Sequence, residues 1–240
     1  MQDSQLIPIR KAAEMLEVSV DTLRRWDRNG YFPAIKSSGG HRYYSMDQVE
    51  LFRKDIFSMA KSWVAAGIGT EPEAEFYCPN SGVFQVRLIR MEKELLETRK
   101  DLSWASLIVS AVGEIGNNSF DHNLGNWRDI PGVFYGYDLR KKQVVLADRG
   151  QGVLATLRRV KSELATDRDA LHTAFTEVIS GRAPEARGNG LKLVRLIVER
   201  YPLSIDFSSG NALATLRHDK KMRISLQKQS MEGCIACIRF

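Results

Sequence analysis

Three short polar strings, set among apolar segments in the C-terminal part of the chain, constrain its fold more than any other feature. They are EIGNNSFDH (Glu114–His122), DRGQG (Asp148–Gly152) and RGNGLKL (Arg187–Leu193). Each string alone fits an ordinary surface element. Their order and separation predict that a helix, the end of a strand and the start of another helix meet around one pocket.

The first string lies in an apolar run that repeats at helical spacing. Its polar side chains, Glu114, Asn118, Asp121 and His122, fall on roughly one face of that helix. An Asn carbonyl together with phosphate oxygens suits Mg²⁺, and a carboxylate one turn away can orient or deprotonate a water molecule. The alternative interpretation is a solvated polar helix face.

The second string follows a β-branched run, so Asp148 is predicted at the carboxyl end of a strand, directly before a glycine-rich turn. An Asp at this place can accept a hydrogen bond from an exocyclic amine such as that of adenine. The glycines allow the backbone to approach a flat ligand closely. The alternative is an ordinary strand–turn–helix corner.

The third string places Gly188 and Gly190 directly before an apolar helix that begins near Leu191. Free backbone amides at a glycine-rich helix start favour phosphate, because the helix dipole adds to them. The alternative is a flexible loop that leads into a helix. Taken together, the three strings predict a site for a nucleotide and its metal ion.

With these strings, the chain from about Leu102 to Phe240 resembles a GHKL ATP-binding domain, the module of DNA gyrase, the heat-shock chaperone and sensor histidine kinases. The resemblance implies ATP and Mg²⁺ as cofactors, with Glu114 as general base, Asn118 as the metal ligand and Asp148 as the acid that reads adenine. It also implies that two glycines shape the adenine wall and that a glycine loop binds the phosphates. The nucleotide-binding residues implied in this way are Asn118, Asp121, His122, Asp148, Gly150, Gly152, Arg187, Gly188, Asn189, Gly190, Leu191 and Lys192.

The same resemblance implies a mobile lid over the phosphates, formed by the residues between Gly152 and Gly188. The family often has a further glycine where this chain has Lys192. The Lys192 side chain then either contacts a phosphate or is exposed in the first turn of its helix.

An independent pattern begins with an amphipathic helix near Ile9–Leu16, followed by a sharp turn at Glu17–Ser19. A second helix is predicted from Val20 to about Asn29, with Ser19 as its cap and Gly30 as its end. The SSGG sequence then joins two short extended segments, which form a wing, and another helix opens at Ser45.

This pattern, with its TLRRW and GGHRYY elements, resembles the winged helix-turn-helix of MerR-type and excisionase-type proteins. The resemblance implies double-stranded DNA as a partner. The second helix would enter the major groove and the wing would contact the backbone or the minor groove, whereas Trp26 would pack in the small core. The predicted DNA-binding residues are Ser19, Asp21, Thr22, Arg24, Arg25, Arg28, His41, Arg42, Tyr43 and Tyr44.

Charge is compatible with polyanionic partners: the 240 residues carry a net charge of +6 and the pI is about 9.3. In the first sixty residues positive charge concentrates locally, in the helix arginines and the wing. A second basic stretch, from Arg217 to Lys228, is interpreted as a solvated hairpin.

The sequence has no signal peptide and no apolar run long enough to span a bilayer, so we expect a cytoplasmic protein without a membrane partner. Cys78, Cys234 and Cys237 are too few and too dispersed for a disulfide framework. Cys234 and Cys237 fall in a predicted strand, where their sulfurs would point to opposite faces.

We therefore predict an α+β protein with three parts: a winged helix-turn-helix (1–60), a linker (61–82) rich in Gly, Pro and acid, and a helical connector with a GHKL-type α/β sandwich (83–240). The connector is predicted either as a short coiled coil or as a helix packed on its own domain. The sandwich should have a mainly antiparallel mixed sheet with helices on one face. Its strands are predicted at 133–139, 143–148, 204–209, 212–218, 222–228 and 234–240.

Function divides into three hypotheses. The first, which we prefer, is a DNA-binding transcriptional regulator whose Mg·ATP-binding domain acts as a conformational switch. The second is an enzyme, either a slow ATPase or a protein-serine kinase of the anti-sigma type; no histidine has the context expected of an autokinase phosphoacceptor. The third is an excisionase-like accessory protein of a mobile element. The sequence leaves open whether two copies form a homodimer.

Overall fold

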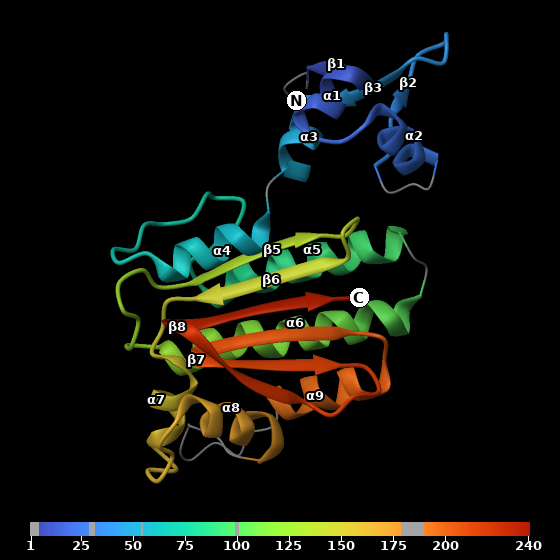
Figure 1. Ribbon diagram of the computed structural model, residues 1–240. Coiled ribbons are helices and arrows are strands. Elements are labelled where there is room, and N and C mark those ends of the chain that lie inside the picture. Colours follow the sequence, from blue (N-terminus) through green and yellow to red (C-terminus); the bar gives the residue numbers. More distant parts are fainter. Residues whose placement is uncertain (1–4, 29–31, 54, 99–100, 179–189) are drawn as a thin grey trace. The chain divides into compact units, whose positions relative to one another are not determined.

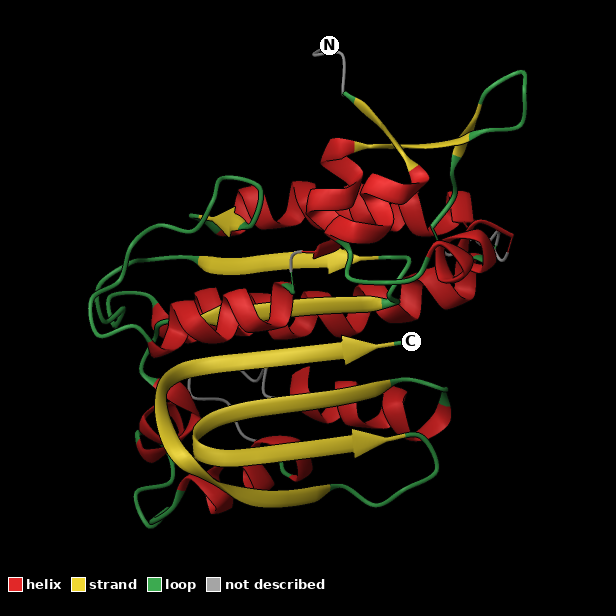
Figure 2. Cartoon of the chain, turned by 45° about the horizontal axis from the view of Figure 1, so that its top comes forward, coloured by secondary structure: helices red, strands yellow, loops and turns green. Residues whose placement is uncertain are grey.

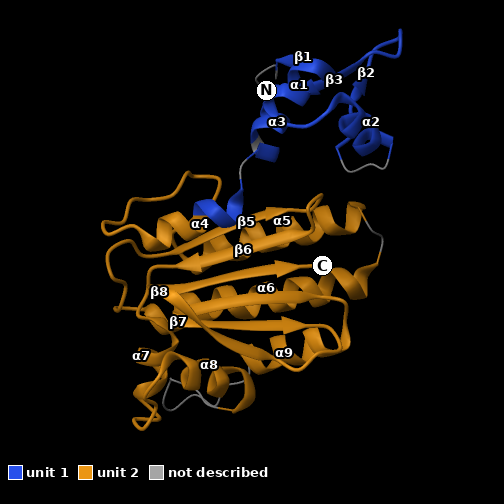
Figure 3. Ribbon diagram, viewed as in Figure 1, with its two compact units in different colours: residues 1–59 blue, residues 60–240 orange. Residues whose placement is uncertain are grey.

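The computed structural model describes residues 5–28, 32–53, 55–98, 101–178 and 190–240 (Figure 1). The chain forms two compact units, residues 1–59 and 60–240 (Figure 3). None of the helices in the described ranges is both long enough and apolar enough to cross a membrane.

Unit 1 has the predicted helix-turn-helix and wing. Its elements, in chain order, are β1 (Leu6–Pro8), α1 (Ile9–Met15), α2 (Val20–Arg28), β2 (Ile35–Lys36), β3 (Arg42–Ser45) and α3 (Met46–Arg53). The three strands form an antiparallel sheet in the order β1-β3-β2. Strand β1, which pairs with the wing strand β3, was not predicted from the sequence.

The turn between α1 and α2 follows from local sequence. Glu17 adopts a positive φ of 54°, which reverses the chain after α1. Ser19 Oγ then accepts a hydrogen bond of 3.0 Å from the Thr22 amide, which confirms the predicted cap of α2. Gly30, predicted to end this helix, lies outside the described residues.

An aromatic cluster forms the centre of unit 1. Phe32 stacks on Tyr44 with ring centroids 5.0 Å apart, and Phe52 contacts both Phe32 and Trp26. Trp26 thus packs against the core, as predicted. The cluster holds α2, β3 and α3 together, which fixes the helix and the wing relative to each other.

Unit 2 is a five-stranded sheet covered by helices. Its elements are α4 (Ile56–Ala65), which crosses the boundary from unit 1, followed by β4 (Tyr77–Cys78), α5 (Ser81–Thr98), α6 (Leu102–Asn123), β5 (Val133–Asp138), β6 (Gln143–Asp148), α7 (Gly152–Arg158), α8 (Asp167–Thr176), α9 (Gly190–Arg200), β7 (Ser204–Arg217) and β8 (Arg223–Arg239). The strand order is β4-β5-β6-β8-β7. Every pairing among the described residues is antiparallel, so the expected mixed component is not found there.

Four of the predicted strands merge into two. β7 and β8 form one long hairpin that bends in the middle, where the register shifts on either side of Gly210, a residue with φ of 58° (Figure 2). The hairpin doubles back on itself, so that the two ends of β7 lie close together. Arg217, at the end of β7, donates hydrogen bonds to Ile205 O and to Asp206, near the start of the same strand. The short strand β4 was not predicted.

Helices α5, α6 and α9 cover one face of the sheet (Figure 1). The connector helix α5 buries Phe84, Leu88, Met91 and Leu95 in the main core of unit 2, so the four- and three-residue spacing marks a helix packed on its own domain. Close packing of α5 on α6 requires a glycine, since a Cβ at Gly116 would overlap the Phe84 ring.

The segment 61–82, expected as a linker, belongs to the fold of unit 2. Trp63 and Phe76 pack on Phe134 on the face of the sheet opposite α6, and β4 pairs with β5. Its Gly, Pro and acidic residues suggest a linker, but the apolar side chains between them bury against the sheet.

Much of the region expected as a mobile lid is helical. It contains α7 and α8, which share a small core of Leu157, Leu164 and Ala170. Leu171 and Phe175 of α8 are fully buried in the main core. Residues 179–187 of the expected lid lie outside the described residues.

Candidate functional site

The three polar strings converge on one pocket in unit 2. Counting the space open to solvent, the pocket has a volume of about 730 Å³. Six of the predicted nucleotide-binding residues line it: Asn118, His122, Asp148, Gly152, Gly190 and Leu191.

Asp148 forms the polar base of the pocket. It is 2% exposed, and its Oδ2 accepts a hydrogen bond of 2.8 Å from Ser119 Oγ. Its Oδ1 accepts hydrogen bonds from Asn123 Nδ2 at 3.2 Å and from the Gly150 amide at 2.9 Å. Burial raises the pKa of Asp148, although these hydrogen bonds oppose the shift. A buried carboxylate with donors fixed on both oxygens keeps one orientation and still has lone pairs for a ligand amine.

Sequence analysis missed the two residues that hold Asp148. Ser119 and Asn123 are one turn apart on α6, facing the end of β6, and both are buried. Asn123 Oδ1 also accepts from the Gln151 amide at 3.1 Å. The sequence held a sign of their role. Ser119 and Asn123 follow Ile115 at four-residue steps on the apolar face of α6, and a polar side chain buried on such a face needs a hydrogen-bond partner.

Two of the motif glycines are required by the packing. A Cβ at Gly150 would overlap the Asn123 side chain, so the turn after Asp148 can approach α6 only with glycine there. Gly152 has a φ of 77°, which glycine adopts readily. The amide of the next residue, Val153, donates a hydrogen bond of 2.9 Å to Ser209 Oγ.

The start of α9 meets the first string beside the pocket, whose lining includes Asn118 and Gly190 but not Glu114. A Cβ added to Gly190 would lie 2.5 Å from Glu114 Oε2 and 3.1 Å from Asn118 Nδ2. Glycine therefore brings the helix start against one carboxylate and one amide. No group of three or more His, Cys, Asp or Glu that could hold a metal is found in the described part of the chain, so a metal here would need phosphate and water oxygens besides Asn118 and Glu114.

The side walls of the pocket are apolar. Ile115 of α6, Val153 and Leu157 of α7, Phe207 of β7 and Leu191 of α9 all line it. Apolar walls above a single buried carboxylate suit a flat heterocycle that carries an amine on its edge.

Of the other predicted nucleotide-binding residues that the structure describes, Gly150, Asp121 and Lys192 lie outside the lining. Asp121 is exposed, and Lys192 is half-buried in the first turn of α9. His122, which lines the pocket, also accepts a hydrogen bond of 2.8 Å at its backbone carbonyl from Gln151 Nε2. Arg187, Gly188 and Asn189 lie outside the described residues, as does most of the expected phosphate loop.

Arg149, the residue between Asp148 and Gly150, is the largest fully buried side chain among the described residues of unit 2. Its guanidinium forms a bidentate pair with Asp129, at 2.8 Å from Nε to Oδ1 and 2.6 Å from Nη2 to Oδ2. Nη1 donates to the carbonyls of Trp63 and Val64, and the guanidinium carbon lies 5.9 Å from the Trp63 ring centroid. The pair with Asp129 raises the pKa of Arg149, and the same hydrogen bonds lower that of Asp129.

These contacts tie the last turn of α4 to the pocket. The carbonyls of Trp63 and Val64 are among those that a helix cannot satisfy at its C-terminus, where a cation is also favoured by the dipole. Asp129 is held in turn by the amides of Gly69 and Ile130, at 2.8 and 2.7 Å. The pocket residue Asp148 and the anchor of α4 are thus consecutive in the chain.

The helix-turn-helix of unit 1 presents a basic face. Arg24, Arg25 and Arg28 are exposed on α2, together with Asp21, whose carboxylate accepts 3.0 Å from Arg24 Nη1. Ser19 and Thr22 bond to each other at the helix start, so their hydroxyls are part of the cap.

The wing is attached to α2 through one buried carboxylate. The Asp27 side chain is 4% exposed and accepts from Arg42 Nε at 2.7 Å, from Lys36 Nζ at 3.1 Å and from the Ala34 amide at 3.1 Å. Burial raises the pKa of Asp27, but these hydrogen bonds outweigh it and lower the pKa to about 2. Arg42, predicted as a DNA contact, is therefore also a structural link between the wing and α2.

The structure removes Tyr44 from the side chains that DNA could reach. It is fully buried, stacks on Phe32 and donates to the Leu23 carbonyl at 3.4 Å. Its neighbour Tyr43 is half-buried, and His41 is exposed at the wing turn. In a strand, alternate residues face the core, and β3 buries Tyr44 rather than Tyr43.

Cys78, Cys234 and Cys237 form no disulfide with one another. Cys234 lines the pocket, whereas Cys237 accepts a hydrogen bond from Gln143 on the other face. The predicted opposite orientation of these two residues is confirmed.

Comparison with known proteins identifies unit 1. Residues 8–44 match the family described as MerR family regulatory protein. No curated protein matches the chain. The match covers α1, α2 and the wing, so the N-terminal unit is a MerR-type helix-turn-helix domain that binds DNA. The resemblance of unit 2 to an ATP-binding domain stays a prediction.

Proposed function

We propose that this chain, with its MerR-type DNA-binding domain, is a transcriptional regulator whose second unit binds Mg·ATP as a conformational switch. The observation that carries the proposal is the convergence of three separate strings on one pocket. That pocket has a buried acceptor at its base, an amide and a glycine helix start in its lining, and a carboxylate beside it.

The residues present fit an adenine nucleotide. Asp148 would accept a hydrogen bond from the exocyclic amine, and the apolar walls would exclude water from the two faces of the ring. Gly190, which has no side chain, lets the start of α9 lie directly against Asn118 and Glu114. Asn118 would supply an oxygen ligand to the metal, and Mg²⁺, when bound, would neutralise phosphate charge.

Two consecutive residues, Asp148 and Arg149, connect the pocket to the helix that leads to the DNA-binding unit. Asp148 would touch the ligand, and Arg149 holds the last turn of α4, the helix that crosses from unit 1 into unit 2. A ligand shifts a protein between two arrangements only through its differential affinity for them. A change in the backbone at Asp148 would act on α4 through the Arg149 side chain.

Adenine binding is tested by Asp148→Asn, which preserves shape but replaces an acceptor oxygen with a donor amide. We expect ATP affinity to fall by about 1.5–3 kcal/mol, the cost of losing a hydrogen bond to a charged group. Isothermal titration calorimetry with Mg·ATP measures the change. Asp219→Asn, an exposed carboxylate at the opposite end of the sheet, is the matched control. Unchanged ATP affinity in Asp148→Asn would remove the adenine assignment, and no binding by the unaltered protein would remove the nucleotide site.

Coupling between the two units is the second expectation. Typical coupling free energies are about 1–3 kcal/mol, so Mg·ATP should change DNA affinity about 5- to 150-fold, and DNA should change ATP affinity by the same factor. Fluorescence anisotropy with a labelled target duplex, with and without Mg·ATP, measures it. Arg149→Lys keeps the charge but loses the bidentate fork, and should reduce the factor while leaving ATP binding in place. Equal DNA affinities with and without ATP in the unaltered protein would show two independent units.

A second candidate function is ATP hydrolysis. The Glu114 carboxylate beside the start of α9 favours it, because a general base must lie close to where a phosphate would bind. A slow ATPase and a switch are compatible in one chain, since hydrolysis would reset the switch.

A further inference from the structure

One edge of the unit 2 sheet carries a marked excess of basic over acidic side chains. We call it the basic edge; it consists of the β5–β6 turn, the β7–β8 turn and the strand ends beside them. Its basic residues are Arg140, Lys141, Lys142, Arg217, Lys220, Lys221, Arg223 and Arg239.

Contacts between the strand ends place these segments at one edge. Gln143, at the start of β6, pairs with Arg239, and the Phe240 amide donates to the Lys142 carbonyl at 3.1 Å. Asp206 accepts from Arg239 at 2.9 Å and from Arg217 at 2.7 Å. The β7–β8 turn lies at the same end of the sheet as the β5–β6 turn (Figures 1 and 2).

The carboxylates at this edge do not balance the charge. Eight basic side chains meet three acidic ones, Asp138, Asp206 and Asp219, which leaves an excess of five positive charges, whereas the whole chain has +6. Asp206 is shared by two arginines. Lys142, Lys220, Lys221 and Arg223 are exposed. Like charges held together repel one another, so the arrangement favours an anionic partner.

We infer that the basic edge binds the phosphate backbone of double-stranded DNA, as a second contact besides the helix-turn-helix. At about 4.8 Å between paired strands, the neighbouring ends of β5, β6, β8 and β7 span about 14 Å. That length of duplex carries about 8 phosphate charges. Lysines on turns suit contacts that carry no base sequence information.

DNA is favoured over other polyanions because unit 1 already brings this partner to the same molecule. The edge lies at the far end of β6 from Asp148, about 17 Å away along five residue steps, so it is separate from the pocket. The inference therefore does not depend on nucleotide binding.

The test is the salt dependence of DNA binding by the full chain, with a 40-base-pair duplex of arbitrary sequence as the probe. Each phosphate contact adds about 0.9 to the slope of log affinity against log salt. The triple variant Lys220→Gln, Lys221→Gln, Arg223→Gln should therefore lower this slope by about 2–3. The control variant Lys61→Gln, Arg168→Gln, Lys228→Gln removes the same charge from exposed positions elsewhere and should change the slope by less than about 1.

A second measurement isolates the edge from the helix-turn-helix. In an Arg24→Ala, Arg25→Ala background, residual salt-dependent DNA binding should persist and be lost on adding the triple substitution. Equal slopes for the triple and control variants would overturn the inference. So would loss of binding to anionic phosphatidylserine vesicles with no change in DNA binding, since the edge would then be a membrane contact. Because the three residues are exposed, thermal unfolding should not move between variants, which excludes a folding defect.

Discussion

Replacing Arg149 with methionine is expected to lower the free energy of unfolding of unit 2 by about 3–5 kcal/mol, the range for breaking a buried ion pair from one side. Methionine keeps much of the volume but removes every donor. Asp129 then loses its bidentate partner, and the carbonyls of Trp63 and Val64 lose the cation that satisfies them.

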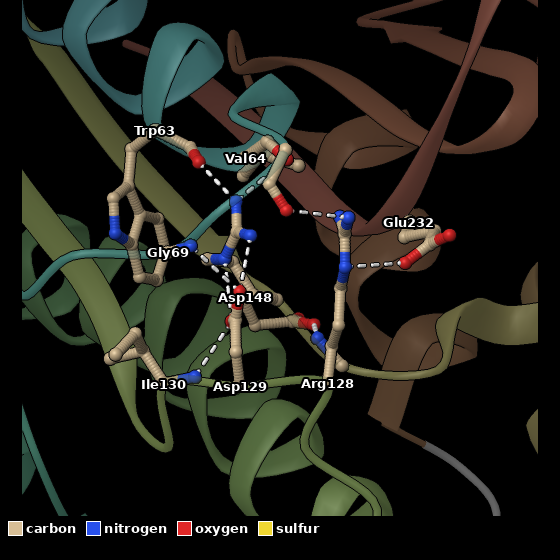
Figure 4. Close-up of polar contacts among 11 residues, drawn as sticks. Trp63, Val64, Gly69, Arg128, Asp129, Ile130, Asp148 and Glu232 are labelled. Atoms are coloured by element: carbon tan, nitrogen blue, oxygen red, sulfur yellow. Dashed lines mark hydrogen bonds and ion pairs between the residues drawn. The ribbon is translucent and has the colours of Figure 1, made fainter.

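Arg128 provides the matched control, because it belongs to the same cluster but is 32% exposed and pairs with Glu232, which is 66% exposed (Figure 4). Exposed pairs contribute about 0–1 kcal/mol, so Arg128→Met should cost little. Hydrogen exchange of the β6 and β8 amides in urea reports unit 2 alone. Equal destabilisation by the two substitutions would show that Arg149 does not anchor α4.

Replacing Glu114 with alanine is expected to slow ATP hydrolysis at least about a hundredfold while ATP still binds, which is the range for loss of a general base. The Glu114 side chain lies beside Gly190 and does not line the pocket, and Ser119, Asn123 and Gly150 hold Asp148, so removing Glu114 should not disturb the adenine acceptor.

Single-turnover hydrolysis and calorimetry on the same preparation separate the chemical step from binding. Glu97→Ala, an exposed carboxylate on α5, serves as the reference. Hydrolysis by Glu114→Ala at the rate of the unaltered protein contradicts the base role. An unaltered protein with no turnover has no ATPase activity, and the switch proposal is then tested by binding alone.

The local features of both units were predictable because they depend on neighbours in sequence. Helical spacing placed α1, α2 and α6, and Ser19 caps α2 as expected from its position before an amphipathic segment. The DRGQG string placed Asp148 at the end of a strand. Residue types and periodicity determine such features before any tertiary contact forms.

Burial of individual side chains was less predictable, because it depends on which face of an element meets the core. Tyr43 and Tyr44 are adjacent and chemically identical, yet β3 turns only Tyr44 inward. Arg42 has the positive charge expected of a DNA contact. In the structure, however, its guanidinium forms an ion pair with the buried Asp27, fifteen residues earlier in the chain.

The sequence by itself determined the existence of a helix-turn-helix with a wing and the three strings that line the pocket of unit 2. The tertiary structure decided what joins them. Ser119 and Asn123 hold Asp148, Arg149 reaches back to α4, and the turn at Arg140–Lys142 lies at the same edge as Lys220 and Lys221. These residues are far apart along the chain, and only the pairing of β6 with β8 and the packing of α6 on the sheet bring them together. Hydrogen bonds and charge clusters of this kind depend on distance in space, which periodicity along the chain does not encode.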